Sequence, residues 1–190
     1  MKLVVGLGNP GSQYSGTRHN VGFDVITELA QRWQAGKPQL KFQAEIREAI
    51  FPSGKVFLIA PMTYMNRSGE SVQQIARFYQ VASEDVAVVC DDINLPLGRL
   101  RWRAGGSSGG QKGLADILQR LGTENVPRLR LGVGRPPGSM DSAAWVLARF
   151  RAEDRSEAEM MVKLAADSIE CWIAEGLAIA MNRFNRSSED

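Results

Sequence analysis

The sequence predicts a three-layer α/β protein in which helices cover both faces of a mixed, mostly parallel, twisted sheet. Strand-like and helix-like segments alternate along all 190 residues, which favours this architecture. Residues 2–8 and 86–90 are nearly continuous apolar runs, which are typical of strands buried on both faces. The length fits one domain, so we expect a single domain over residues 1–190 with a frayed tail at 186–190.

The first strand, residues 2–8, ends in glycine, and a helix is expected after it. This helix begins at Asn20, and its apolar residues recur at helical spacing until Gly36-Lys37-Pro38 ends the pattern. Residues 41–50 and 55–60 then read as two strands on either side of a short turn. That arrangement predicts a hairpin or two neighbouring strands.

The alternation continues through the middle of the chain. Residues 61–69 form a loop that leads into a helix whose apolar face carries Val72, Ile75, Ala76 and Tyr79. Residues 97–103 alternate between apolar side chains and arginines, as in a strand with one solvated face. The glycine-rich residues 105–113 lead into a helix that Gly122 closes.

The last part of the chain predicts one more strand and a long helix. Residues 128–134 form the strand, again with alternating arginines. The apolar face of the helix carries Met161, Leu164, Ala165, Ile169, Trp172 and Ile173. Ser156 and Glu159 match the spacing of a capping box at its start. Gly176 interrupts the helix, and a short helical tail extends to about Phe184.

Composition excludes several classes of protein. Apolar residues make up 44% of the chain, but no run is long enough to cross a bilayer. The sequence opens on a strand and not on a secretory signal, and Cys90 and Cys171 stand far apart. We therefore expect a cytoplasmic protein with no membrane association, no disulfide framework and no metal.

The net charge of +2 says little about partners, but the distribution of charge says more. Five arginines lie in two short segments: Arg99, Arg101, Arg103, Arg128 and Arg130. They predict a local basic patch of the kind that binds nucleic acid. A solvated sheet face is the alternative explanation for their alternation.

Polar side chains follow three of the expected strands, and one of them is the only histidine in the chain. Asn9 and His19 follow the first strand, Tyr64-Met65-Asn66 the third, and Asp91-Asp92 the fourth. In open α/β sheets, ligands bind beyond the carboxyl ends of the strands. The sequence therefore predicts one site built from these segments.

The residue types at this site suggest hydrolysis by water. A neutral imidazole at His19 can take a proton from water, and a carboxylate at Asp91 can orient it. Amides at Asn9 and Asn66 can bind an ester or peptide carbonyl. No serine or cysteine has the setting of an activated nucleophile, because Ser107-Ser108 does not form a G-x-S-x-G sequence.

Each of these residues also has a purely structural explanation. His19 can cap a helix, Asn9 can shape a turn, Asn66 can begin the next helix, and Asp91 can be a strand-end charge. Gly6-Leu7-Gly8-Asn9-Pro10-Gly11 suggests a nucleotide-dependent oxidoreductase, but no helix opens directly after it as the dinucleotide fingerprint requires.

With these residues assembled, the chain resembles the bacterial peptidyl-tRNA hydrolase family from Val4 to about Phe184. The resemblance rests on several long motifs in the family's order. They are Val5-Gly6-Leu7-Gly8-Asn9-Pro10-Gly11, Thr17-Arg18-His19-Asn20-Val21-Gly22-Phe23, Pro61-Met62-Thr63-Tyr64-Met65-Asn66-Arg67-Ser68-Gly69, Asp91-Asp92, Gly105-Gly106-Ser107-Ser108-Gly109-Gly110, Arg128-Leu129-Arg130-Leu131-Gly132-Val133-Gly134 and Asn182-Arg183-Phe184.

The resemblance implies an enzyme that cleaves the ester between a peptide and the 3′ end of tRNA, and so recycles tRNA from peptidyl-tRNA that has left the ribosome. It implies no cofactor or metal, and a monomer. His19 would activate water with support from Asp91, and Asn9 would help to discriminate blocked from free aminoacyl groups.

The resemblance also implies where the tRNA binds. Tyr14, Tyr64 and Asn66 would contact the tRNA end or the peptide. Arg103 and Arg130 would hold the 5′ phosphate of the acceptor stem, for which a guanidinium is well suited.

The chain departs from the family pattern in the glycine-rich loop. Many members have histidine followed by asparagine where this chain has Gln111-Lys112, so Lys112 would meet a tRNA phosphate in place of the asparagine contact. Cys90 also stands where histidine is common. This departure leaves a second hypothesis open, a non-catalytic RNA-binding protein on the same scaffold.

Overall fold

Seven strands form one sheet in the computed structural model, which describes residues 1–185. They are β1 (Lys2–Gly6), β2 (Gln39–Lys41), β3 (Ala44–Phe51), β4 (Gly54–Pro61), β5 (Val86–Asp92), β6 (Leu100–Arg103) and β7 (Arg128–Gly132). Their order is β2-β3-β4-β1-β5-β7-β6. The four central strands are parallel, and antiparallel strands extend the sheet at both edges. The tail expected to be frayed lies outside the described residues.

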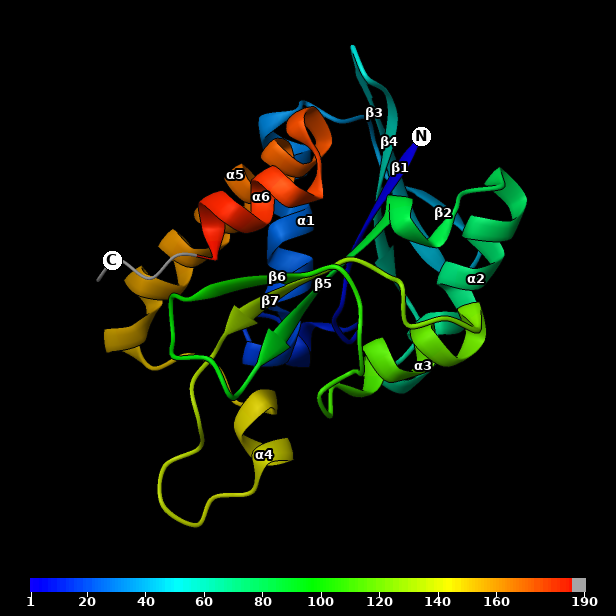
Figure 1. Cartoon of the computed structure of the whole chain (residues 1–190). Helices are drawn as coiled ribbons and strands as arrows, with labels where there is room; N and C mark the ends of the chain where they lie inside the picture. Colours follow the sequence, from blue (N-terminus) through cyan, green and yellow to red (C-terminus); the bar gives the residue numbers. More distant parts are fainter. Residues whose placement is uncertain (186–190) are drawn as a thin grey trace.

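Helices cover both faces of this sheet (Figure 1). They are α1 (Val21–Arg32), α2 (Ser68–Tyr79), α3 (Lys112–Leu121), α4 (Ser142–Leu147), α5 (Arg155–Glu175) and α6 (Leu177–Phe184). The helices α1, α5 and α6 lie on one side, and α2 and α3 lie on the other (Figure 1). The short helix α4 stands apart, below the ends of β5 and β7 (Figure 1). The expected mixed, mostly parallel three-layer fold is confirmed.

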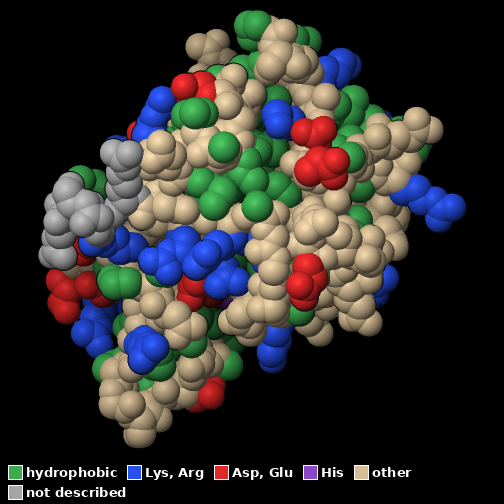
Figure 2. Space-filling view, in the orientation of Figure 1, with side chains coloured by type: hydrophobic (Ala, Val, Ile, Leu, Met, Phe, Trp, Pro, Cys, Tyr) green, Lys and Arg blue, Asp and Glu red, His purple; other side chains and the backbone are tan. Residues whose placement is uncertain are grey.

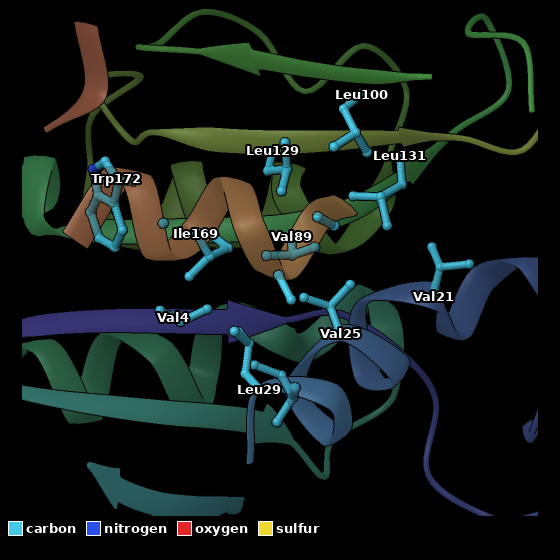
Figure 3. Close-up of a cluster of buried hydrophobic side chains, with 14 of the residues drawn as sticks. Val4, Val21, Val25, Leu29, Val89, Leu100, Leu129, Leu131, Ile169 and Trp172 are labelled. Carbon is cyan, nitrogen blue, oxygen red and sulfur yellow. The ribbon is translucent and has the colours of Figure 1, made fainter. Parts of the chain in front are cut away.

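Each face of the sheet has its own hydrophobic core, because side chains alternate along every strand. Val4 of β1 points into the core beneath α1 and α5, with Leu29 and Ile169 (Figure 3). Its neighbours Leu3 and Val5 point into the other core, beneath α2 and α3. The central strands are therefore apolar at nearly every position.

Two local predictions are wrong. Residues 41–50 do not form one strand, because Phe42 and Gln43 have left-handed backbone angles (φ 53° and 57°) and turn the chain between β2 and β3. The capping box is absent, because α5 begins at Arg155 and its N-cap, Asp154, makes no side-chain cap bond.

A third correction concerns the apolar face of α5. Most of its expected residues are buried, but Leu164 is 41% exposed. It lies beside a groove between α5 and the loop before β6. No helix of the described residues is both long enough and apolar enough to cross a membrane.

Candidate active site

A cleft of about 640 Å³ opens at the carboxyl ends of the parallel strands. The predicted residues that line it are Asn9, His19, Tyr64, Asn66, Asp91, Lys112 and Arg130. Asp141 and α4 supply the wall that faces them. The separate strand-end segments therefore meet in one cleft, and the function of this cleft stays a prediction.

His19 and Asp91 are in direct contact inside this cleft. Nδ1 of His19 lies 3.0 and 2.9 Å from the two carboxylate oxygens of Asp91. The side chain of Asp91 is only 4% exposed, and that of His19 is 14% exposed. An ionised carboxylate only accepts hydrogen bonds, so Nδ1 carries the proton and Nε2 keeps a free lone pair.

The position of His19 follows from the close packing of α1 on the sheet. His19 lies in a short 3₁₀ turn, η2 (Arg18–Asn20), that leads directly into α1. A Cβ at Gly22, in the first turn of α1, would lie 2.3 Å from the nitrogen of Leu7 and 2.6 Å from the oxygen of Val89. Glycine therefore lets α1 begin against the ends of β1 and β5, which brings His19 to the end of β5 where Asp91 lies.

Asn9 is held by three hydrogen bonds that leave one donor available. Its backbone N–H donates to Oδ1 of Asn20 (2.9 Å), and its carbonyl accepts from Nδ2 of Asn20 (3.0 Å). Its own Oδ1 accepts the backbone N–H of Met65 (2.8 Å). Within residues 1–185, Nδ2 of Asn9 has no partner, so this amide can donate to a ligand in the cleft.

Asn20 and Arg18 are site residues that the sequence reasoning missed. Arg18 is 1% exposed, and its guanidinium carbon lies 3.4 Å from the ring centre of Trp145 in α4. Its Nη1 donates to the carbonyls of Ala148 and Arg149. Arg18 thus attaches the α4 wall to the turn that carries His19. Both lie in the motif Thr17-Arg18-His19-Asn20-Val21-Gly22-Phe23 beside His19, and this is the sequence signal that could have found them.

Gln111 is a third residue whose role was missed. Its Nε2 donates to Oδ1 of Asp91 (3.1 Å), and its Oε1 accepts the backbone N–H of Leu114 (2.7 Å). It is therefore the N-cap of α3 and a second donor to Asp91. Glutamine is not among the favoured N-cap residues, so nothing in the local sequence signals this position.

Cys90, the cysteine that lines the cleft, is not a ready nucleophile. Burial raises the pKa of the Cys90 thiol to about 12, with a further contribution from the charge of neighbouring Asp91. Because only a thiolate is a good nucleophile, Cys90 is inert at neutral pH. Residues 1–185 contain no group of three or more His, Cys, Asp or Glu side chains that could hold a metal ion.

The predicted basic residues do not lie together, and Arg99 is half-buried beside the groove between α5 and the loop before β6. Arg130 lines the cleft, where it pairs with Asp92 (3.3 Å). Arg101 and Arg103 are exposed on β6, outside the cleft lining. Lys and Arg side chains gather over β6 and β7 in the space-filling view (Figure 2).

Arg128 belongs neither to the predicted basic patch nor to a solvated sheet face, so both expectations are wrong for this residue. It is fully buried, and its guanidinium donates to four backbone carbonyls, at Gly106, Ser107, Glu124 and Val126. Two of these carbonyls belong to the glycine-rich loop before α3. Arg128 therefore holds the loop that leads to Gln111 and Lys112.

Tyr14 is not among the residues that line the cleft. Its backbone carbonyl accepts the hydroxyl of Thr17 (2.7 Å), so it supports the turn before His19. Its contact with substrate stays a prediction.

Comparisons with known proteins agree with this geometry. The family model for peptidyl-tRNA hydrolase matches residues 3–190. A peptidyl-tRNA hydrolase of Rhodopirellula baltica is 47% identical over 188 residues, which cover 99% of each chain. One from a Synechococcus strain is 50% identical and covers 97% of this chain and 83% of its own. The crystal structure of the Acinetobacter baumannii peptidyl-tRNA hydrolase superposes with a TM-score of 0.90 at 35% identity, over 97% of this chain and 94% of that one.

Proposed function

The chain belongs to the peptidyl-tRNA hydrolase family, and from this premise we propose that His19 and Asp91 carry its ester hydrolysis. The family assignment confirms the hydrolase interpretation over an RNA-binding protein without activity or an oxidoreductase. The observation that carries the assignment of residues is the contact between Nδ1 of His19 and the carboxylate of Asp91 in the cleft.

In the proposed step, Nε2 of His19 takes a proton from a water molecule. The water oxygen attacks the ester carbonyl that joins the peptide to the 3′ ribose of the tRNA. The bond from the carbonyl carbon to the ribose oxygen then breaks, and the imidazolium returns its proton to that oxygen. Asp91 stabilises the imidazolium between these two transfers, because its carboxylate accepts from Nδ1.

Asn9 supplies the donor for the acyl group. Its Oδ1 is already occupied by the backbone of Met65, so only the Nδ2 donor faces a ligand. A fixed donor can bind the carbonyl oxygen of the substrate without reorganisation during the reaction. We assign to Asn9 the discrimination of N-blocked from free aminoacyl-tRNA, since a blocked substrate offers a peptide carbonyl.

We assign the tRNA to the side of the cleft where Arg130 and Lys112 lie. Arg130 and Arg103 would hold the 5′ phosphate, and Lys112, at the first position of α3, would meet a second phosphate. Tyr64 is 58% exposed at the cleft and presents a ring on which a terminal base can stack. Asn66 and Tyr14 are assigned to the tRNA end or the peptide. We also propose that the enzyme is a cytoplasmic monomer and that residues 1–190 form one domain.

A defined N-blocked aminoacyl-tRNA, compared with its free-amine counterpart, tests the assignment. We expect the wild type to cleave the blocked ester much faster. His19→Ala should lower kcat by about 10²–10⁴-fold, the range for loss of a general base, and leave tRNA binding nearly unchanged. Retained turnover in His19→Ala would remove His19 from the mechanism.

A further inference from the structure

Asp91 has a second hydrogen-bond donor besides His19. Gln111 Nε2 lies 3.1 Å from Oδ1 of Asp91, the oxygen that lies 3.0 Å from Nδ1 of His19. The three side chains form a chain of contacts from the glycine-rich loop to the proposed base.

We propose that Gln111 is a positioning residue that holds the Asp91 carboxylate in the orientation His19 requires. This inference rests on the proposed function of His19 and Asp91. Gln111 has no assigned contact with the reacting atoms, and it acts through Asp91.

The orientation of the Gln111 amide is determined by α3. Its Oε1 accepts the backbone N–H of Leu114 at 2.7 Å, so the opposite end of the amide, Nε2, points away from α3. There Nε2 donates to Oδ1 of Asp91 (3.1 Å) and also lies 3.2 Å from Sδ of Met65. The start of α3 is itself fixed, because a Cβ at Gly113 would lie 2.5 Å from Sδ of Met65 and 3.0 Å from a methyl carbon of Leu7. The amide is therefore held on a rigid element and not on a free loop.

Burial makes this contact important for Asp91. Its side chain is 4% exposed, so protein donors must replace most of the water that would solvate its charge. Losing one of two donors leaves part of the carboxylate unsatisfied and free to rotate away from the imidazole. An amide is also neutral at every working pH, so the Gln111 contact does not titrate along with His19.

The variant Gln111→Glu separates the two roles of the Gln111 side chain, which caps α3 and donates a hydrogen bond to Asp91. Glutamate keeps the size of glutamine and can still accept the N–H of Leu114, so it preserves the cap of α3. When it is ionised, however, it has no proton to donate to Asp91, and its charge repels that carboxylate. Because two carboxylates in contact share one proton at lower pH, kcat is compared on the basic side of the pH–rate profile, where both are ionised. Gln111→Leu removes both roles. Gln73→Glu also loses one amide donor, here to the carbonyl of Arg120 (2.6 Å), and adds the same charge at an exposed position of α2 outside the cleft.

For Gln111→Glu we expect kcat to fall about tenfold or more and KM to change less. The substitution misaligns the proposed base, His19, and leaves the position of the substrate unchanged. The added negative charge favours the imidazolium, so the acidic limb of the pH–rate profile should move up by about one pH unit. Gln73→Glu should have the same kcat and the same acidic limb of the pH–rate profile as the wild type. Unchanged kcat and an unmoved limb in Gln111→Glu would overturn the proposal, whatever happens to the melting temperature.

A second readout does not depend on activity. His19 is the only histidine, so a preparation without a histidine tag gives a single imidazole titration by NMR. Its midpoint should rise in Gln111→Glu and stay constant in Gln73→Glu; no shift in Gln111→Glu contradicts the proposal even if that variant is inactive for another reason. If His19→Ala remained active, the proposed function itself would fail, and that result is distinct from either outcome at Gln111.

Discussion

Individual side chains in the cleft take their orientation from partners far away along the sequence. Asn9 is oriented by Asn20 and by Met65, which is 56 residues away. His19 is oriented by Asp91, 72 residues away. Asn20 bonds to the backbone of Asn9, whereas Met65 satisfies its Oδ1 and leaves Nδ2 available. Asp91 satisfies Nδ1 of His19 and leaves Nε2 available, so the loss of Asp91 should affect chemistry more than folding.

Asp91→Asn tests this at the proposed base. An amide at this position can donate to Nδ1 and so favours the wrong imidazole tautomer, which puts the proton on Nε2. We expect kcat to fall by about 10²–10⁴-fold with little change in tRNA affinity. Single-turnover hydrolysis alongside a tRNA-binding titration measures both quantities, and kcat close to that of the wild type would contradict the role of Asp91.

Asp24, in the first turn of α1, is a residue whose charge opposes folding. Burial raises the pKa of Asp24 from the usual 3.8 to about 6. The folded state therefore binds a proton between about pH 4 and 6 that the unfolded state has already released, and stability falls as pH rises through this window. Above it, the ionised carboxylate lowers stability by a constant amount.

Asp24→Asn should remove this penalty. We expect the free energy of unfolding at pH 8 to rise by about 2 kcal/mol, and the advantage to shrink toward pH 4. Urea unfolding of both proteins at pH 4, 6 and 8 measures it. A gain that is equal at all three pH values would have another cause than the ionisation of Asp24.

At the level of elements, the site depends on how closely the first turns of α1 and α3 approach the sheet. Gly22 and Gly113 stand at these contacts, where a side chain would overlap neighbouring atoms. The two helices begin beside the same strand ends, and they carry His19 and Gln111 just before their first turns. Small residues at helix starts therefore set the distances within the cleft.

Gly22→Ala tests this packing. In a solvated helix, replacing glycine by alanine stabilises by about 1 kcal/mol. Here the new Cβ would lie 2.3 Å from a backbone nitrogen that cannot move freely, so overpacking should reverse the sign. We expect a net loss of about 1–3 kcal/mol together with reduced kcat.

Gly36→Ala is the matched control, because its Cβ would meet nothing within 4 Å. Thermal unfolding should show it equal to the wild type or slightly more stable. A Gly22→Ala protein as stable as Gly36→Ala would show that α1 can shift away from the sheet without loss.

For the molecule as a whole, charge is distributed unevenly although the net charge is only +2. Basic side chains gather over β6 and β7, beside the end of the sheet where the cleft opens (Figure 2). The cleft with the proposed base and the basic surface thus lie next to each other. A substrate with a reactive end and a long phosphate backbone fits this arrangement.

Arg103→Ala should weaken tRNA binding with little effect on kcat at saturating substrate. One lost phosphate contact lowers the slope of log affinity against log salt by about one. Arg77→Ala removes the same charge from an exposed position of α2 and should leave the slope unchanged. Binding titrations at several salt concentrations measure this, and equal slopes for the two variants would refute the assignment of Arg103.

The sequence by itself determined the layers of the fold and the gathering of Asn9, His19, Asn66 and Asp91 at one edge. Apolar runs and helical spacing are local patterns, and parallel strands bring their carboxyl ends to the same side without further information. The family motifs add the reaction class, because those motifs are themselves continuous stretches of sequence.

Only the tertiary structure decided which polar atoms meet. Arg128 has the same spacing pattern as Arg103, yet it is buried on backbone carbonyls while Arg103 is exposed. Gln111 bonds to Asp91 across 20 residues, and Arg18 reaches the carbonyl of Ala148 across 130. Such pairs form only when separate elements pack against one another. A pattern within one segment of the sequence therefore cannot predict them.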